Sequence, residues 1–403
     1  MGYTLNDKIL DIPEAMSIYM NQLVYSEKRK GLDVVTLSLG EAFFDIPQFC
    51  INETDFVKGY HYSDSLGIPE LREKIVEYYN KNYGSEINDI AQVMISSGSK
   101  AIIYMVILAV CNMGDEVLIH EPAWLSYQEQ ARLANAIPVF APYDINIREI
   151  VGLFTGKTKL LVLNNPNNPA GWIYSKEDLK YLYEECKKRG IFILIDEAYS
   201  DFVIADNEFV SMSAIADDLD GVFIVNSLSK NMGMSGWRIG YVISSKKNVE
   251  VLLVLNQHII TCAPTILQNY IAQYFDDIVA ITMPQVKEVV KKRKRILTCL
   301  DENGLKYLPG NSTFYIFVNI GELDVDTLDF CLYLLFKYGI ATVPGGAYGR
   351  STDKFIRIGI GAESEERIAE AISVIGMVIR NNLANKEYVQ HKLEINNYHR
   401  FGE

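Results

Sequence analysis

The sequence has 403 residues, which is too long for one minimal domain and favours roughly two to three domains. Apolar residues make up 49% and charged residues 22% of the chain, so the composition excludes a disordered protein and predicts a large hydrophobic core. The formal net charge of −13 argues against a nucleic acid or an anionic membrane as the main partner, because both require a positive surface.

Neither the apolar runs nor the cysteines indicate a membrane or a secreted protein. The longest apolar run, 101–111, has 11 residues, whereas about 20 are needed to span a bilayer. The first residues, MGYTLNDK, lack the pattern of a signal peptide. The six cysteines are scattered without a CxxC pair, which suits neither a zinc site nor a disulfide framework. We therefore expect a soluble, cytoplasmic protein.

The predicted elements begin with an N-terminal arm of mixed character, residues 1–35. A helix is predicted from Pro69, because proline suits the first helical turn and LREKIVEYY repeats apolar residues at helical spacing. Further on, helical segments such as KEDLKYLYEECKKRG, which ends at Gly190, alternate with short apolar runs. The runs cover residues 93–96, 116–120, 137–141, 160–163, 191–195, 222–225 and 239–243. This alternation predicts an α/β fold with a mainly parallel sheet covered by helices.

After about residue 285 the pattern changes to that of a smaller α+β domain. A basic helix is followed by the strand TFYIFVNI, a helix, two strands around ATVPG and KFIRIGI, and the helix EERIAEAISVIGMVI. The sequence thus divides into an arm (1–35), a large domain (36–284), a small C-terminal domain (285–383) and an extension (384–403). We expect the arm to join the small domain, and the polar extension has no assigned role.

Several familiar patterns carry no functional prediction. Residues 152–158, GLFTGKT, have three residues between the glycines where a phosphate-binding P-loop needs four. Gly359 and Gly361 lack the third glycine of a dinucleotide-binding fingerprint. The five histidines show no metal-binding spacing, so no metal is predicted. The basic run 291–295 is interpreted as the solvated face of an amphipathic helix.

Two loops at predicted strand ends combine residues suited to a ligand site. NNPNNPAG, residues 164–171, follows the strand 160–163, and ligands bind α/β sheets at the carboxyl ends of their strands. Asp196 ends the next apolar run, where a carboxylate is costly to bury unless a cationic group lies beside it. An ordinary turn and a structural ion pair are the alternative interpretations of these two segments.

Two further segments indicate an amine nucleophile and an anion site. Lys230 follows an apolar strand in a glycine-rich turn, where partial burial lowers the pKa of an amine and suits it to Schiff-base chemistry. Arg238, eight residues later, offers two parallel donors to a phosphate. Residues 97–100, SGSK, open an apolar helix, and the free amides of a helix N-terminus bind anions.

In this order, the four segments resemble those of the class I/II aminotransferases, a family of pyridoxal-phosphate enzymes of fold type I. The resemblance extends from about Leu37 to Ile379, and SLSKNMGMSGWRIGY is its most specific part. NNPNNPAG, DEAY, TVPGGAYG and KFIRIGI match as well. It implies that the large domain, 36–284, binds pyridoxal 5′-phosphate and that the sheet is that of fold type I.

The resemblance also implies the catalytic residues. Lys230 matches the lysine that holds the cofactor as a Schiff base and then moves a proton at the substrate Cα. Asp196 matches the carboxylate that keeps the pyridine nitrogen protonated, so that the ring accepts electrons. Tyr199 and Asn168 match the two groups that bind the 3′ oxygen of the cofactor.

Other matches concern the cofactor's ring and phosphate. Trp124 stands where the family places an aromatic ring stacked on the pyridine, although a core tryptophan is the alternative. The residues that match the phosphate cradle are Ser99 and Lys100, through their backbone amides, together with Ser227 and Arg238. Tyr62 matches a tyrosine that reaches the phosphate across a dimer interface, so we expect a homodimer with shared active sites.

For the substrate, the resemblance implies three contacts. Arg357 matches the arginine that binds the α-carboxylate through two parallel hydrogen bonds. Gly40 matches a backbone contact near the same carboxylate, and Asn168 also faces the substrate. Ala170 departs from the pattern, because the family usually has threonine there.

The expected function is transfer of the amino group of an α-amino acid to a 2-oxo acid through the Lys230 Schiff base. The alternative is a lyase, cyclase or oxidase that uses the same fold and cofactor and acts on an amino acid through a quinonoid intermediate. A cofactor-sensing regulator is disfavoured, because only about 35 residues precede the family-like region. An inactive scaffold is disfavoured by the presence of Lys230, Asp196 and Arg357. The sequence leaves the amino acid, the oxo acid and the pathway open.

Overall fold

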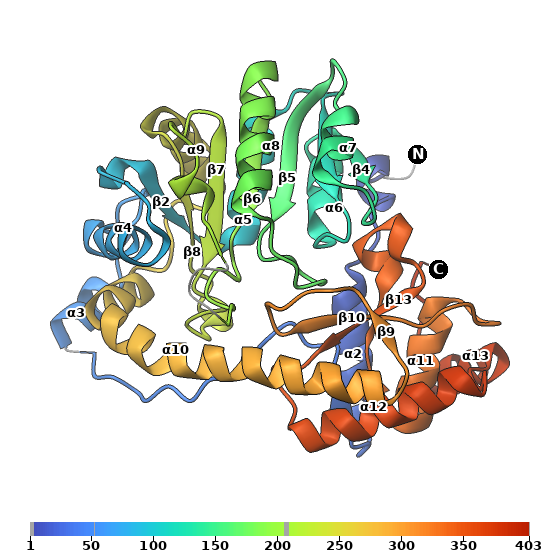
Figure 1. Cartoon of the computed structure of the whole chain (residues 1–403). Coiled ribbons are helices and arrows are strands. Elements are labelled where there is room, and N and C mark those ends of the chain that lie inside the picture. The colour runs from blue at the N-terminus through green and yellow to red at the C-terminus, as the bar shows by residue number, and fades with distance from the viewer. Residues whose placement is uncertain (1–3, 52, 205–208, 403) are drawn as a thin grey trace.

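The computed structural model describes residues 4–51, 53–204 and 209–402, in which a seven-stranded and a four-stranded sheet are the main organising elements. In Figure 1 the larger sheet and its helices form the upper part of the molecule and the smaller sheet lies below. The long helix α10 (Thr265–Glu302) passes under the upper part and reaches the helices around the smaller sheet. The chain thus has two sheet-based regions joined by one helix.

The larger sheet is mainly parallel, as predicted. Its strands are β2 (Val93–Ser96), β3 (Glu116–His120), β4 (Ile137–Ala141), β5 (Thr158–Asn164), β6 (Phe192–Asp196), β7 (Val222–Ser227) and β8 (Gly240–Ile243). The order is β2-β8-β7-β6-β5-β3-β4, and only β8 runs antiparallel to its neighbours. The inner strands are apolar throughout because both faces of the sheet are covered.

Helices cover the larger sheet on both faces. One face packs against α5 (Ser99–Val110), α6 (Ser126–Leu133) and α9 (Lys246–Ile259). The other face packs against α4 (Pro69–Tyr83), α7 (Ile147–Gly152), α8 (Lys176–Arg189) and the first half of α10. As predicted, Pro69 lies in the first turn of α4, and Gly190 ends α8 with a φ of 65°.

The smaller sheet is antiparallel and has the order β12-β13-β10-β9. Its strands are β9 (Lys306–Tyr307), β10 (Tyr315–Asn319), β12 (Val343–Pro344) and β13 (Phe355–Gly359). The helices α11 (Thr327–Tyr338) and α12 (Glu365–Arg380) share its apolar core. Beside it, β1 (Val35–Thr36) pairs in parallel with β11 (Ile340–Ala341).

Short 3₁₀ turns complete the connections: η1 (Ile90–Gln92), η2 (Met212–Ala214), η3 (Ser235–Trp237), η4 (Gly345–Tyr348) and η5 (Arg350–Thr352). The helix α3 (Glu53–Lys58) lies near the first turns of α10 in Figure 1. Among the described residues, no helix combines the length and apolarity needed to cross a membrane.

The basic run on α10 corrects one interpretation from the sequence. Arg293 is not on a solvated face: its side chain is 1% exposed and donates hydrogen bonds to the backbone oxygens of Tyr315, Gly310 and Ala170. Lys291 and Lys294 on the same helix are exposed. A basic run does not reveal that one of its members is turned inward, because the carbonyl partners come from three distant segments.

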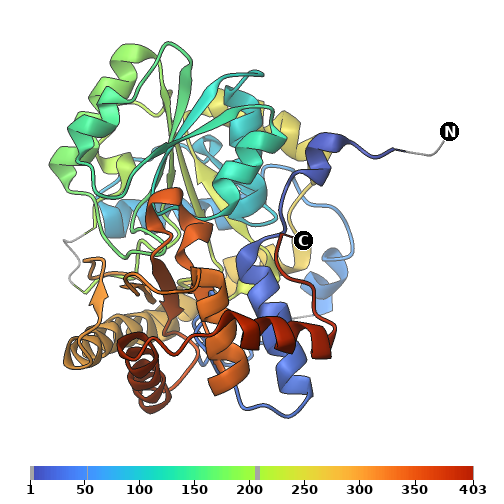
Figure 2. The ribbon, with the colours of Figure 1, turned by 90° about the vertical axis from the view of Figure 1, so that its right-hand side faces the viewer.

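The C-terminal extension and helix α2 (Met16–Arg29) of the arm pack on the smaller region, whereas Lys8 near the start of the arm donates a hydrogen bond of 2.7 Å to Asn135 beside the larger sheet. The arm contains α1 (Asp7–Leu10) and α2, and four residues of α2 are buried in the same core as α11 and α12. The C-terminal extension, which had no assignment, forms α13 (Lys386–Asn396) and packs on α11. In Figure 2 the last residues run up beside α2. The domain boundaries at residues 36, 285 and 384 stay a prediction.

Candidate functional site

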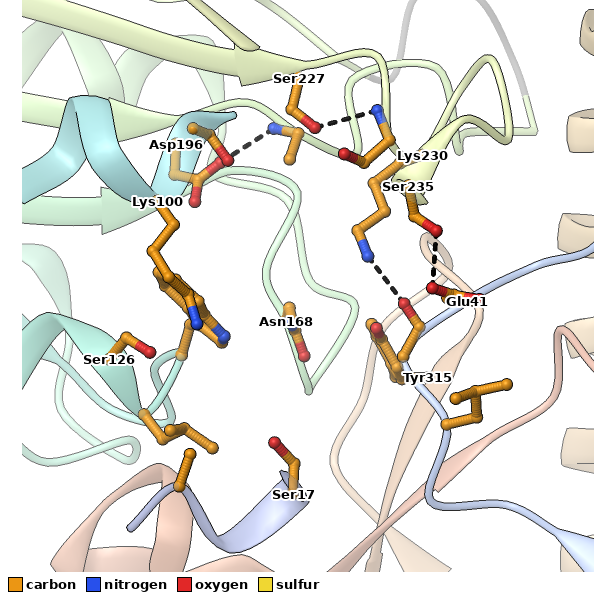
Figure 3. Close-up of a pocket in the computed structure, with 18 of the residues that line it drawn as sticks. Ser17, Glu41, Lys100, Ser126, Asn168, Asp196, Ser227, Lys230, Ser235 and Tyr315 are labelled. Atoms are coloured by element: carbon orange, nitrogen blue, oxygen red, sulfur yellow. Dashed lines mark hydrogen bonds between the residues drawn. The ribbon is translucent and has the colours of Figure 1, made fainter. Parts of the chain in front are cut away.

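A cavity of about 380 Å³ lies between the carboxyl ends of β5, β6 and β7 and the smaller sheet. Every predicted site residue except Tyr62 lines it. Figure 3 shows Lys230, Asp196 and Asn168 arranged around the opening, with Ser17 of α2 on the opposite side. The residues come from the strand ends because parallel strands deliver their following loops to one edge of the sheet.

Lys230 lies in the loop after β7 and points into the cavity (Figure 3). Its Nζ donates a hydrogen bond of 2.7 Å to the backbone oxygen of Gly40. The same Nζ lies 5.8 Å from the ring centroid of Tyr199 and 5.9 Å from that of Phe314. Within the described part of the chain, no carboxylate forms an ion pair with this amine. An amine held by a neutral carbonyl remains available to a carbonyl ligand.

Asp196 ends β6 and is 7% exposed. Oδ2 accepts a hydrogen bond of 2.7 Å from the Tyr127 hydroxyl, and Oδ1 accepts one of 3.1 Å from the backbone N–H of Ala198. Burial raises the pKa of the Asp196 carboxyl, and these two hydrogen bonds and the charge of Lys230 oppose that rise. A cationic ligand group next to Asp196 would offset the desolvation of its charged form.

Asn168 lies in the loop after β5, and the loop is fixed by its own asparagines. The backbone N–H of Asn168 donates to Asn164 Oδ1 at 2.6 Å, and Asn167 Oδ1 accepts from the Ala170 N–H at 2.9 Å. The side-chain Oδ1 of Asn168 is buried at the cavity and has no hydrogen-bond partner in the described residues. Since buried polar atoms are normally paired, this oxygen is suited to a ligand donor.

Tyr199 lies just after β6 and is 3% exposed. Its hydroxyl donates to the Tyr315 hydroxyl at 3.1 Å, and burial together with Tyr315 raises the pKa of Tyr199 well above its ordinary value. Tyr315 belongs to β10, so this hydrogen bond joins the two sheet regions at the cavity.

The N-terminus of α5 forms the cationic end of the cavity. Its cap residue, Gly98, has a φ of 86° and no side chain to bond the first amides, so the amides of Ser99 and Lys100 remain open. A Cβ on Gly98 would lie 2.5 Å from Nη2 of Arg238, which places that guanidinium against the helix end. Ser227 also lines this end. The arrangement is suited to an anion with several oxygens, such as a phosphate.

Trp124 forms another wall of the cavity. Its ring contacts that of Tyr127 edge to face, with centroids 5.3 Å apart. Lys100 Nζ lies 5.0 Å from the Trp124 ring centroid, and burial, followed by the charge of Arg238, lowers the pKa of that amine. The tryptophan therefore faces a ligand space rather than the apolar core alone.

Arg357 approaches the cavity from the smaller sheet. It lies on β13, which is paired on both sides, and its side chain is buried at 4% exposure. Nη2 donates to the Ser38 backbone oxygen at 2.7 Å, and Nε is buried without a partner in the described residues. Its Cζ lies 4.5 Å from the Tyr315 ring centroid. A buried guanidinium without a carboxylate partner is suited to an anionic ligand group.

Tyr62 is the predicted site residue that does not line the cavity. It is 85% exposed and borders a separate hollow with Ser97, Ile259 and Pro264. Ser97 lies two residues before the start of α5, so the hollow adjoins the cationic end of the cavity.

Sequence reasoning missed several residues of the cavity. Tyr127 bonds Asp196, Tyr315 bonds Tyr199, and Ser17 and Asn21 of α2 form the far wall. Tyr127 was within reach of prediction, because it lies one helical turn after Trp124 in the same segment. Ser17 and Asn21 carry no sequence signal, because they belong to a helix distant in sequence from every motif.

Comparisons with known proteins agree with this geometry. Residues 33–375 match the family model described as aminotransferase class I and II. A probable aspartate/prephenate aminotransferase of Aquifex aeolicus is 34% identical over 373 residues, covering 86% of this chain and 91% of that protein. An aromatic-amino-acid aminotransferase of Thermococcus litoralis is 28% identical over 384 residues, covering 91% of this chain and 98% of that protein.

Among solved structures, the aspartate aminotransferase of Thermus thermophilus with maleate superimposes with a TM-score of 0.84. It is 25% identical, and the match covers 94% of this chain and all of that one. The sheet, the order of its strand-end loops and the family match agree with pyridoxal-phosphate fold type I. The chain belongs to the aminotransferase class I and II family and is a pyridoxal-phosphate-dependent aminotransferase.

Proposed function

We propose that the cavity between the two sheets is the active site for amino-group transfer and that Lys230, Asp196 and Arg357 each have a separate role in it. The observation that carries the proposal is that these three side chains line one cavity although they come from the loop after β7, the end of β6 and β13. An amine, a carboxylate and a guanidinium on one cavity provide a base, a partner for a cation and a partner for a carboxylate.

The residues present fit pyridoxal phosphate. The open amides of α5 and Arg238 suit its phosphate, Asn168 Oδ1 and the Tyr199 hydroxyl suit its ring substituents, and Asp196 suits a protonated ring nitrogen. Trp124 would supply an aromatic face to the ring. When bound, the cofactor supplies a carbonyl that bonds an amine and a cationic ring that accepts the electron pair left at Cα.

Lys230 has two roles in this proposal, covalent anchor and base. Once the amino group of the substrate has replaced Lys230 as the covalent partner of the cofactor, Nζ is free to remove the proton from Cα of the amino acid. The Gly40 oxygen, 2.7 Å away, holds this nitrogen on the side of the cavity that Arg357 also borders. A fixed position of Nζ relative to Cα lowers the entropic part of the barrier.

Arg357 binds the α-carboxylate in this proposal. Ser38 occupies Nη2 through its backbone oxygen, and Tyr315 lies against the guanidinium plane, so the side chain has one orientation. Nε has no partner among the described residues. Together with the neighbouring Nη2 it offers the two parallel N–H donors that bind the two oxygens of a carboxylate. Arg357 therefore sets which end of the amino acid faces the small sheet.

We propose aspartate as an amino donor. The proposal is supported by the names of the aspartate aminotransferase relatives and by a further cation, Lys100, which lines the cavity without an acidic partner in the described residues. A side-chain carboxylate would find in Lys100 a second positive group besides Arg357. The aromatic aminotransferase relative makes phenylalanine and tyrosine the competing donors.

The test is a titration of the purified holoenzyme with single amino acids in the absence of any oxo acid, followed by absorption and by assay of released oxo acid. Aspartate should change the cofactor absorption and release one oxaloacetate per site. If only phenylalanine or tyrosine changes the cofactor absorption, the donor is an aromatic amino acid and not aspartate. Release of ammonia without a lasting change of absorption would instead favour elimination chemistry and contradict amino-group transfer.

The assembly and location belong to the same proposal. A homodimer is supported by the exposure of Tyr62 beside the cationic end of the cavity and by exposed apolar side chains around it, such as Tyr60 and Ile259. Acidic composition and six cysteines without a disulfide support a cytoplasmic protein.

A mixing experiment tests the shared site. If Tyr62 serves the other subunit, hybrids of Lys230→Ala and Tyr62→Phe chains should contain one fully intact site per dimer. Their activity per intact Lys230 should then equal that of the wild type and exceed that of the Tyr62→Phe homodimer. Equal activity of hybrid and Tyr62→Phe homodimer per intact Lys230 would place Tyr62 in its own subunit's site.

A further inference from the structure

The C-terminal extension lies along α2, the helix of the N-terminal arm. Residues 396–401, from the last residue of α13 onward, run beside α2, as the dark red and blue segments in Figure 2 show. Both segments lie outside residues 33–375, the part that matches the family model. The two ends of the chain thus form a contact that the family match does not include.

The tail contacts both ends of α2, in antiparallel order. Asn396 and Tyr398 accept hydrogen bonds from Lys30 Nζ at 2.6 and 2.7 Å, just beyond the C-terminal end of the helix. The Tyr398 hydroxyl also donates to Glu27 at 2.7 Å. At the other end, His399 contacts Glu14, which lies two residues before α2 begins.

The first turn of α2 has the closest packing with this segment. The Tyr19 hydroxyl donates to the His399 backbone oxygen at 3.0 Å. The Tyr19 ring meets the rings of His399 and Phe401 edge to face, with centroids 5.3 and 5.5 Å apart. Tyr19 is 1% exposed, enclosed by the apolar core of the smaller region together with these tail residues.

The tail itself is anchored to the smaller region. Arg400 forms ion pairs with Asp326 and with the buried Asp329 at the N-terminus of α11. Upstream, the Tyr388 hydroxyl donates to the backbone oxygen of Phe336 in α11 at 3.2 Å. The C-terminal extension therefore bridges α2 and α11.

The first turn of α2 is also a wall of the cavity. Ser17, Ile18 and Asn21 line it, opposite the strand-end loops of the larger sheet (Figure 3). Asn21 Oδ1 accepts from the Ser38 hydroxyl at 2.8 Å, and Ser38 is the residue whose backbone oxygen holds Arg357. A displacement of this turn would change the shape of the cavity on the side of α2, and it would disturb Ser38, which holds Arg357.

We propose that residues 396–401 are positioning residues for substrate binding: they hold the first turn of α2 against the cavity and thereby set the affinity for the amino acid. The inference rests on the proposed location of the substrate in this cavity. Met20, Leu23 and Val24 keep the rest of α2 in the apolar core. Loosening the tail therefore lowers the fraction of molecules in which the first turn of α2 lies against the cavity, without unfolding the helix.

The test uses the full-length holoenzyme with the double substitution Tyr398→Phe/His399→Ala. These changes remove side-chain contacts with Lys30, Glu27, Glu14 and Tyr19, and they leave Arg400 in place. The matched control is Tyr181→Phe/His391→Ala, which changes the same two residue types on α8 and on the exposed side of α13. Kinetics with aspartate, cofactor content and hydrogen–deuterium exchange of residues 14–21 are compared.

The double variant should raise KM for the amino donor about three- to tenfold with kcat within about twofold, because only the fraction of binding-competent protein falls. Exchange of residues 14–21 should accelerate, exchange of α9 should stay unchanged, and cofactor content should equal that of the wild type. The control variant should match the wild type in all four measurements.

An unchanged KM with faster exchange at 14–21, or equal effects of the control, would overturn the inference. If the double variant does not fold, Tyr398→Phe alone decides by the same criteria. Failure of the proposed site itself is recognised separately: Arg357→Lys would then leave KM unchanged. If Arg357→Lys raises KM and the tail variant does not, only the role of the tail is wrong.

Discussion

The two walls of the cavity are built in different ways. The upper wall consists of loops that each follow a strand of the larger sheet, and Asn168, Asp196 and Lys230 lie in or at the start of these loops. The lower wall combines β10, β13, the segment 38–41 and α2, which are distant from one another in the sequence. Consecutive loops of one sheet place the residues proposed for the cofactor, whereas contacts between distant segments place those proposed for the substrate.

Polar contacts differ in the same sense. In the upper wall, Asn168 is held by Asn164 in its own loop. Asp196 is held by Ala198, two residues away, and by Tyr127 of α6, a helix on the same sheet. In the lower wall, the Arg357 guanidinium is held by the backbone oxygen of Ser38, 319 residues away in the sequence. Lys230 of the upper wall reaches across the cavity to the Gly40 oxygen of the lower wall, 190 residues away. Substitutions in the upper wall should therefore change the chemical step, and those in the lower wall should change substrate affinity.

The largest effect is expected for Lys230→Ala. Loss of a positioned acid–base group costs up to about 10⁴-fold in rate, and in the proposed mechanism the covalent anchor is lost as well. Single-turnover release of oxo acid measures the effect, and Lys247→Ala on the exposed surface of α9 is the control. Normal transfer by the Lys230→Ala enzyme with an unchanged circular dichroism spectrum would remove this residue from the mechanism.

Asp196→Asn should lower kcat by about 10²- to 10³-fold, because the buried partner of a cation contributes electrostatic stabilisation of that order. Cofactor retention during dialysis should fall too. Tyr127→Phe is the informative comparison, since it removes one hydrogen bond to Asp196 but keeps the carboxylate. Equal losses in both variants would show that the geometry of this pair, rather than the charge of Asp196, matters.

Arg357→Lys should raise KM for the amino donor about 10- to 100-fold with a smaller change in kcat. The physical reason is the loss of a parallel pair of charge-assisted hydrogen bonds, worth about 1.5–3 kcal/mol. Arg380→Lys, an exposed arginine of α12 that bonds the Asn303 backbone oxygen, serves as the control. A loss confined to kcat would contradict the division between the two walls.

The smallest effect on activity is expected at Glu197, the buried residue that directly follows Asp196, where the pH dependence of the free energy of unfolding should change. Burial raises the pKa of Glu197 to about 8, against hydrogen bonds from Met212, Ser211 and Tyr79. Its folded pKa lies above the ordinary value of 4.5. The stability it contributes is therefore complete below pH 4.5 and is lost as pH rises towards 8.

Denaturant unfolding between pH 5 and 8 measures this contribution. For the wild type, Glu197 should lower the free energy of unfolding with a slope approaching about 1.4 kcal/mol per pH unit. Glu197→Gln should reduce that slope without a comparable change in KM. An identical slope in both proteins would mean that Glu197 stays ionised in the folded state.

Much of the upper wall could be predicted from the sequence. Apolar runs marked the strands, and the residues that follow them, such as Asp196 and Lys230, had to meet at one sheet edge because the strands are parallel. The boundaries of α4 and α8 were also predictable, since Pro69 and Gly190 act through local backbone preferences. These features depend on residues close together in the chain.

By itself, the sequence determined the alternation of strands and helices, the loops at the strand ends and the resemblance to the family. Tertiary structure alone decided that Arg293 turns inward to three carbonyls, that Tyr315 meets Tyr199, and that the C-terminal extension contacts α2. The physical reason is the range of the interactions. Periodicity and turn chemistry act over a few residues, whereas a buried polar group takes its partner from whichever distant segment the packed core brings beside it.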